Sequence, residues 1–153
     1  AAFALVLGVG AAATNTAPFP SALDWIAGLI ALTALVGEAI SDAQLARFRA
    51  DPANKGKVCE AGLWGYSRHP NYFFEWLWWC TLPCIAFAGF SVGALAVLSF
   101  LPPAMMYLLL NYGSGIPPLE RHMIASRGDA YREVQNRVNA FFPGPRRAGK
   151  GAQ

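Results

Sequence analysis

Four apolar stretches, separated by short polar or proline-containing segments, dominate the hydrophobic pattern of this chain. They cover roughly residues 1–14, 22–40, 72–90 and 92–112. A helix needs about 20 apolar residues to span a bilayer, and the last three stretches are long enough or nearly so. The pattern predicts an all-α, polytopic helical membrane protein, with about four apolar helices in two hairpins and short cytoplasmic helices.

Turn-forming residues and prolines predict where the apolar helices end. Residues 14–20 and 89–91 are typical of turns, and we expect the two hairpins to close there. Pro83 and the pair at 102–103 lie inside apolar stretches and should kink or break their helices. Membrane helices tolerate such breaks where neighbouring groups satisfy the freed carbonyls.

The basic residues are confined to two polar stretches. All twelve lysines and arginines fall within residues 41–71 and 113–153, whereas the turns 14–21 and 88–92 hold none. Two hairpins would present both basic stretches on one side, and the positive-inside rule makes that side cytoplasmic. We therefore expect an integral membrane protein of the bacterial inner membrane, or an equivalent membrane, with its basic side cytoplasmic.

This arrangement suggests one domain with three parts. We expect a transmembrane region over residues 1–112, which includes a cytoplasmic loop at 41–71. A cytoplasmic helical cap would follow over residues 113–145, and residues 146–153 are typical of a disordered tail.

Composition supports a membrane protein and excludes an ordinary soluble domain. Of the 153 residues, 55% are hydrophobic and 14% charged, and the mean hydropathy is +0.33. The chain starts inside an apolar run without an initiator Met, which is typical of a fragment. The three cysteines, Cys59, Cys80 and Cys84, form no metal-binding pattern, so we expect no metal site. Nothing in the sequence suggests a nucleic-acid partner.

Residues 62–75, Gly-Leu-Trp-Gly-Tyr-Ser-Arg-His-Pro-Asn-Tyr-Phe-Phe-Glu, hold the most informative motif. Pro70 suits the first turn of a helix, with His69 near its cap. Arg68 can donate two hydrogen bonds to an anion, and a helix N-terminus also favours phosphate. This part of the motif predicts a site for an anionic nucleotide.

A second part of the motif lies on the apolar side of the proline. Asn71 and Glu75 are four residues apart and share one helix face. An alternative interpretation is an interfacial anchor, in which Trp64 and Tyr66 mark the headgroup region. The anchor explains the aromatic residues but not Asn71 and Glu75.

The segment before the motif offers further candidates. Glu38, Asp42 and Arg49 lie near one face of a helix that continues the second apolar stretch. The simpler alternative is an amphipathic helix that leaves the bilayer, although Glu38 lies within the apolar stretch and needs a partner. Lys55 and Lys57 could contact a phosphate, but a solvated loop is the simpler interpretation of residues 51–61.

The C-terminal stretch predicts two short helices. One starts at the prolines of residues 117–118 and ends near Gly128, and the other covers residues 130–138. An alternative is an amphipathic surface on lipid, with Arg127 and Arg132 on its polar face. Glu120, Tyr131 and Arg137 are better candidates for a site if this stretch folds over the motif.

Together with residues 114–120 and 131–143, the motif resembles the DUF1295 family. That family is similar to the C-terminal halves of steroid 5α-reductases and sterol C14 reductases. Those are polytopic membrane enzymes that use NADPH to reduce a carbon–carbon double bond. The resemblance covers about residues 38–145. It implies an oxidoreductase of lipid metabolism that acts on a lipid or steroid-like enone, with NADPH as cofactor and an apolar small molecule as substrate.

The resemblance also implies which residues line the cofactor pocket. In the reductases, an acid and a basic residue precede the loop, the motif follows, and C-terminal helices close over the nucleotide. The corresponding residues are Glu38, Asp42, Arg49, Trp64, Tyr66, Arg68, His69, Asn71, Glu75, Glu120, Tyr131 and Arg137. No catalytic residue is assigned, because the acid and tyrosine that engage the enone come from the N-terminal half of those enzymes. Phe74 departs from the family pattern, since relatives often have glycine there.

Two alternatives to the reductase stay open. Membrane methyltransferases of the isoprenylcysteine carboxyl methyltransferase type share the Arg-His-Pro-x-Tyr core and a downstream Glu, but use S-adenosylmethionine. That cofactor carries no phosphate and needs fewer basic contacts. The residues that favour the reductase are Asp42 with Arg49, Lys55 and Lys57, together with Asn71 and Glu75 of the motif. The chain could also be a non-catalytic membrane fragment that holds half of a cofactor site.

Overall fold

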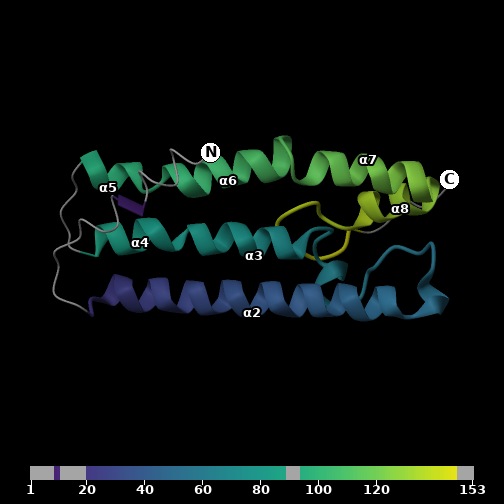
Figure 1. Ribbon diagram of the computed structural model, residues 1–153, viewed down its shortest axis with the longest axis horizontal. Coiled ribbons are helices and arrows are strands. Elements are labelled where there is room, and N and C mark those ends of the chain that lie inside the picture. The colour runs from purple at the N-terminus through teal and green to yellow at the C-terminus, as the bar shows by residue number, and fades with distance from the viewer. Residues whose placement is uncertain (1–8, 11–19, 89–93, 148–153) are drawn as a thin grey trace. The chain divides into compact units, whose positions relative to one another are not determined.

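The computed structural model describes residues 9–10, 20–88 and 94–147, and every regular element within these ranges is a helix. The all-α prediction is confirmed. The helices of Figure 1 are α2 (Ala22–Ala50), α3 (Pro70–Trp79), α4 (Thr81–Phe87), α5 (Ala94–Leu98), α6 (Leu101–Tyr112), α7 (Ile116–Arg127) and α8 (Asp129–Arg137). Two 3₁₀ turns cover Pro52–Asn54 and Gly62–Gly65. The predicted turns at 14–20 and 89–91 and the first apolar stretch lie largely outside the described residues.

Helix starts follow local sequence signals. The Ser21 and Asp24 side chains cap α2 reciprocally, because Ser21 N donates to Asp24 Oδ2 at 2.7 Å and Asp24 N to Ser21 Oγ at 3.3 Å. Pro70 is the first residue of α3, as predicted. The other prolines of the apolar stretches also lie in first turns, since α4 begins two residues before Pro83 and α6 one residue before Pro102. The prolines therefore start new helices after short breaks.

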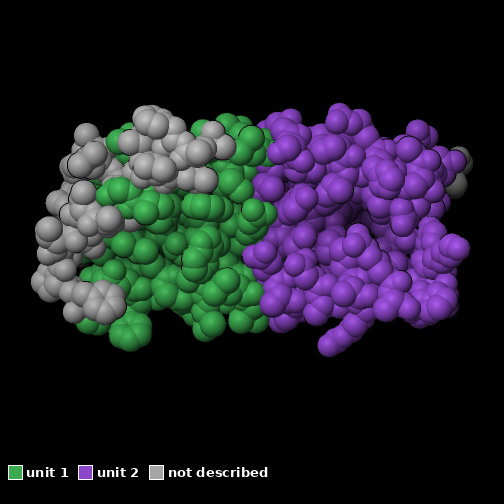
Figure 2. Space-filling view, viewed as in Figure 1, with its two compact units in different colours: residues 1–36, 74–109 green, residues 37–73, 110–153 purple. Residues whose placement is uncertain are grey.

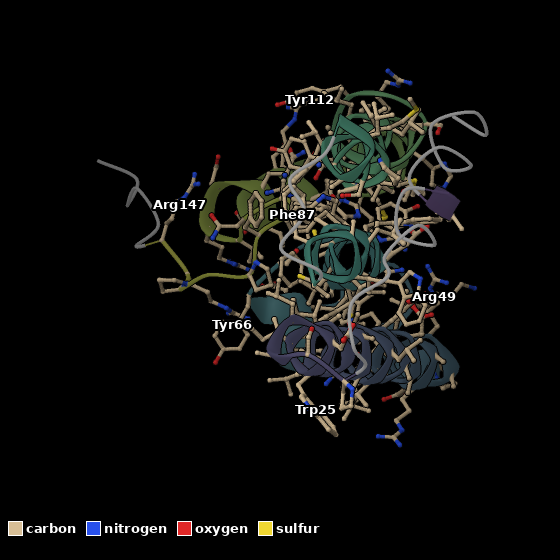
Figure 3. The ribbon with its side chains drawn as sticks, turned by 90° about the vertical axis from the view of Figure 1, so that its left-hand side faces the viewer. Trp25, Arg49, Tyr66, Phe87, Tyr112 and Arg147 are labelled. Carbon is tan, nitrogen blue, oxygen red and sulfur yellow. The ribbon has the colours of Figure 1, made fainter. Side chains whose placement is uncertain are left out.

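Among the described residues, two helical stretches are long and apolar enough to cross a membrane. They are Ala22–Ala50 and Ala96–Arg127, the second taken as one run through α5, α6 and α7. Along α2, Trp25 is 71% exposed and Leu29 66%, and Figure 3 shows the Trp25 ring projecting away from the helix. Large apolar side chains exposed along a helix of this length suit contact with lipid.

The chain forms two compact units, coloured separately in Figure 2. Unit 1 comprises residues 1–36 and 74–109, and unit 2 comprises residues 37–73 and 110–153. All twelve lysines and arginines belong to unit 2, whereas Asp24 and Glu75 are the charged residues of unit 1. The division by packing thus coincides with a division by charge.

Unit 1 is held by apolar and aromatic packing. Trp76 Nε1 donates to the Pro103 carbonyl at 3.0 Å, and its ring meets Tyr107 edge to face at 6.2 Å between centroids. Ala86 and Ala96 are buried together. Within this unit is an apolar cavity of about 810 Å³, lined by Leu23, Ile30, Trp76, Cys80, Pro83, Cys84, Phe87, Phe100, Pro103, Ala104, Tyr107 and Leu108.

In unit 2, α7 and α8 form a pair joined at Gly128, whose φ of 55° ends α7 as predicted. Of the predicted tail, residues 146–153, the structure describes Arg146 and Arg147. Arg146 donates to the Gly65 carbonyl at 3.2 Å, and Arg147 donates to Asn139 Oδ1 at 3.0 Å. Residues 148–153 lie outside the described part of the chain.

Candidate functional site

The backbone of the Ser67–Arg68–His69 turn is fixed by the segment that follows α8. Arg68 N donates to the Asn139 carbonyl at 2.8 Å, and Ser67 Oγ donates to the Phe141 carbonyl at 2.8 Å. The same hydroxyl accepts from His69 N at 3.1 Å. Because Ser67 is fully buried, these bonds are shielded from water. They set the directions of the Arg68 and His69 side chains.

The 3₁₀ turn before the motif is tied to the polar half of α2. Trp64 Nε1 donates to the Ser41 carbonyl at 2.9 Å, and Leu63 N donates to Gln44 Oε1 at 2.9 Å. Trp64 is buried, so its ring provides apolar contact while its N–H has a partner. These bonds bring the end of α2 beside the motif.

Glu120 of α7 lies at the centre of a partly buried polar network. Its Oε1 accepts from Arg68 Nε at 2.7 Å and lies 3.3 Å from His69 Nε2. Tyr131 donates its hydroxyl to Oε1 at 3.2 Å, and Gln135 donates to Oε2 at 2.8 Å. The carboxylate thus links the motif to both C-terminal helices.

Arg68 is largely committed to this network. Its Nη2 lies 2.7 Å from Glu120 Oε1, and its Nη1 donates to the Gln135 and Val138 carbonyls at 3.2 and 2.5 Å. A guanidinium has five N–H donors, so these contacts leave one N–H group of Arg68 available to a ligand. Arg68 was predicted to donate hydrogen bonds to an anionic ligand. In the structure it acts mainly to join the motif to α8.

The Tyr131 hydroxyl is held in its neutral form. Burial and the neighbouring Glu120 carboxylate raise the pKa of this phenol far above its ordinary value. Because the folded protein binds this proton more tightly than the unfolded chain does, Tyr131 stabilises the fold fully below the unfolded pKa of about 10. That stabilisation is lost as the pH rises from about 10 toward the raised pKa.

This titration gives a testable prediction. Above about pH 10, the free energy of unfolding should fall more steeply in the wild type than in Tyr131→Phe, by about 1.4 kcal/mol per pH unit. Denaturant unfolding in detergent at several pH values measures both slopes, and the other titrating groups cancel in the comparison. Equal slopes would contradict the assignment of a raised pKa to Tyr131.

A polar cavity of about 370 Å³ lies within unit 2, next to this network. Figure 2 shows that the face of unit 2 turned to the viewer is hollowed. Seven of the residues predicted for the cofactor pocket line the cavity: Asp42, Arg49, Trp64, Arg68, His69, Asn71 and Tyr131. Residues from α2, the motif, α3 and α8 therefore line one cavity.

The other five predicted residues do not line this cavity. Glu120 accepts hydrogen bonds from Arg68 and Tyr131, which do line it. Arg137 makes an ion pair with Glu60 through two hydrogen bonds. Tyr66 is 55% exposed, and its ring projects outward in Figure 3. Glu38 and Glu75 are absent from the residues that line the cavity.

The cavity also contains residues that sequence reasoning did not assign to the site. They are Leu45, Phe48, Lys57, Val58, Cys59, Tyr72, Leu119, Met123, Arg127 and Val134. Leu119, Met123 and Arg127 are spaced by four residues, which places them on one face of α7. That spacing could have identified this wall from the sequence. Tyr72 stacks on His69 with 5.8 Å between ring centroids.

The lining groups suit an organic anion better than a metal ion. Arginine and lysine side chains contribute positive charge, Asn71 and Asp42 offer hydrogen-bonding groups, and Trp64 and Tyr72 offer aromatic surface. No group of three or more His, Cys, Asp or Glu side chains suited to a metal occurs among the described residues. Burial raises the pKa of the Cys59 thiol, so this lining residue stays protonated near neutral pH.

The model of a family described as "Protein of unknown function (DUF1295)" matches residues 1–138. No curated protein and no solved structure matches the chain.

Proposed function

The chain belongs to the DUF1295 family, and we propose that it is an NADPH-dependent membrane reductase of a carbon–carbon double bond in a lipid or steroid-like enone. The observation that carries this proposal is the convergence of Asp42, Arg49 and Asn71 on one cavity with the Arg68–His69 turn. These residues come from three separate segments of the chain. We expect these segments to converge if the motif forms part of a cofactor-binding site.

The chemistry of the polar cavity supports an anionic dinucleotide. Arg49, Lys57 and Arg127 can pair with phosphates, whereas Asp42 and Asn71 can hydrogen-bond hydroxyl or amide groups. Trp64 and Tyr72 offer surfaces on which flat rings can pack. The residues of this chain would bind and orient the cofactor, and NADPH would supply the hydride.

The apolar cavity of unit 1 supports an apolar substrate. Its volume of about 810 Å³ and its aliphatic and aromatic lining suit a hydrocarbon skeleton better than a polar metabolite. In the proposed reaction, a hydride adds to the β-carbon of the enone, and the resulting enolate takes a proton at the α-carbon. We assign no residue to that protonation.

We place the protein in a bacterial inner membrane or an equivalent membrane, as a polytopic protein with unit 2 facing the cytoplasm. All twelve basic residues belong to unit 2, which supports this orientation through the positive-inside rule. Cytoplasmic NADPH would then have access to the polar cavity.

A methyltransferase that uses S-adenosylmethionine is the second candidate. Asp42, Trp64 and Tyr72 favour it, because a carboxylate and aromatic faces can hold a sulfonium cation. The positive charge of the same cavity favours the phosphate-bearing cofactor instead. A non-catalytic membrane protein is the third candidate, and the following experiment separates all three.

The test uses the full chain in a neutral detergent. Calorimetric titration with NADPH, NADH and S-adenosylmethionine measures binding, and NADPH oxidation is followed with and without an enone lipid. We expect NADPH to bind most tightly and the enone to stimulate its oxidation. Asn71→Ala should weaken NADPH binding by about 10-fold, because a hydrogen-bonding partner is lost. Its control, Asn136→Ala, changes an exposed residue of α8 that does not line the cavity.

Selective binding of S-adenosylmethionine would replace the reductase with the methyltransferase. Binding of neither cofactor would leave the non-catalytic interpretation. NADPH binding without enone-dependent oxidation would retain the cofactor but reject the enone as substrate.

A further inference from the structure

The polar cavity carries more positive charge than its carboxylates balance. Four basic side chains line it, namely Arg49, Lys57, Arg68 and Arg127, but Asp42 is its one lining carboxylate. Glu120 neutralises Arg68. Among the described residues, no ion pair involves Asp42 or the other three cations. We call Arg49, Lys57 and Arg127 the cationic triad. Even if Asp42 offsets one of them, an excess remains that favours an anionic ligand.

Arg127 is held in place by neighbours that do not neutralise it. Its Nε donates to the Lys57 carbonyl at 3.1 Å, and its Nη1 donates to Ser126 Oγ at 2.9 Å and contacts Met123 Sδ at 3.3 Å. These acceptors are uncharged, so the positive charge is retained. In the described part of the chain, no hydrogen bond involves Nη2. The guanidinium is therefore preorganised, with two N–H donors left for a ligand.

The loop that carries Lys57 is also ordered. Asp51 Oδ1 accepts from Ala53 N at 2.9 Å, and Asn54 Nδ2 donates to the Phe48 carbonyl at 3.0 Å. Gly56 takes a positive φ of 80°, and the chain then reaches Lys57, whose carbonyl accepts from Arg127. The sequence favoured a solvated loop here, but these bonds place Lys57 at the wall of the cavity. Its side chain is exposed and free to adjust to a ligand.

We propose that the cationic triad is a phosphate-binding subsite of the polar cavity. If the proposed function is correct, on which this identification rests, the phosphate belongs to NADPH. Arginine supplies a planar fork that matches two phosphate oxygens, and lysine supplies a mobile point charge. A phospholipid headgroup offers the same chemistry, so the experiment must distinguish a nucleotide phosphate from a lipid phosphate.

The test compares variants of the full chain in detergent without phospholipid. Arg127→Gln and Lys57→Gln should each weaken NADPH binding by about 10- to 100-fold, because each removes a charged hydrogen-bond donor. Arg127→Lys should recover part of the loss. Arg121→Gln is the matched control, since Arg121 is exposed on the same helix and does not line the cavity. Its affinity should stay within about twofold of the wild type.

A second readout uses Cys59, which lines the cavity and is 8% exposed. In a Cys80→Ser, Cys84→Ser background, bound NADPH or pyrophosphate should slow alkylation of Cys59 at least about 10-fold in the wild type, but not in Arg127→Gln. The same assay in nanodiscs with and without phosphatidylglycerol tests the lipid source. Lys57→Gln changes an exposed side chain, so it tests the subsite even if Arg127→Gln fails to fold.

The outcomes separate this proposal from the proposed function. If NADPH binds equally to the wild type, Arg127→Gln and Lys57→Gln, the subsite is overturned and the reductase stands. If NADPH does not bind but pyrophosphate or phosphatidylglycerol protects Cys59 through Arg127, the subsite stands and the reductase fails. If no phosphate-bearing ligand protects Cys59, the subsite is overturned.

Discussion

Replacing Glu120 with alanine is expected to destabilise unit 2 by about 3–5 kcal/mol and to abolish binding in the polar cavity. The change leaves the Arg68 guanidinium, whose side chain is 10% exposed, without its carboxylate partner. It also removes the acceptor of the Tyr131 hydroxyl and of Gln135. An unpaired buried charge costs far more than the ion pair contributed, so the Arg68–His69 turn should lose its fixed geometry.

Denaturant unfolding in detergent measures this effect, and Glu133→Ala is the matched control. Glu133 is an exposed carboxylate of the neighbouring helix, and its removal should change the stability by less than about 0.5 kcal/mol. A second variant, Arg68→Met with Glu120→Leu, replaces this largely buried pair by apolar groups. It should recover much of the stability without recovering ligand binding, because Arg68 lines the cavity. If Glu120→Ala is as stable as Glu133→Ala, the network around Glu120 does not stabilise unit 2 as its geometry indicates.

The features that the sequence predicted well depend on local physics. Pro70 and Pro117 start helices because a first-turn residue needs no N–H partner, and Gly128 ends one because glycine tolerates a positive φ. The helical spacing of Asp42 and Arg49 placed them on one face of α2, and both line the polar cavity. Each of these signals can be recognised in a short segment of sequence, without knowledge of the rest of the fold.

The roles of individual charges were harder to predict, because they depend on partners distant in sequence. Arg68 was expected to bind an anion, but its partner Glu120 lies 52 residues away. Arg137 was expected in the cofactor pocket, but it pairs with Glu60 across 77 residues. The alternative for Arg127 was the polar face of an amphipathic helix on lipid, yet Arg127 donates to the Lys57 carbonyl of the loop and lines the cavity. Residue type and spacing do not reveal which opposite charge a side chain meets after folding.

Truncation after Val138 is expected to have the second large effect, which is loss of folded unit 2. It removes the Asn139 carbonyl that accepts from Arg68 N and the Phe141 carbonyl that accepts from Ser67 Oγ. It also removes the Phe141 ring, which is 4% exposed and packs against Phe73 with 5.9 Å between centroids. Loss of one such buried aromatic side chain costs about 3–5 kcal/mol. With the lost hydrogen bonds, the total approaches the whole stability of a small domain, about 5–15 kcal/mol.

The matched control is truncation after Arg147, which keeps every contact described for this segment, including the Gly144 N–H bond to the Tyr66 carbonyl. Its melting temperature and NADPH affinity should equal those of the full chain. A milder pair tests the same idea without shortening the chain: Phe141→Ala should cost about 3–5 kcal/mol, whereas Phe142→Ala should cost less, because Phe142 is 50% exposed. The chain truncated after Val138 could instead have the melting temperature and NADPH affinity of the full chain. The Ser67–His69 turn would then keep its geometry without the segment after α8. The motif would then be a self-contained binding element, and the segment after α8 would only cover it.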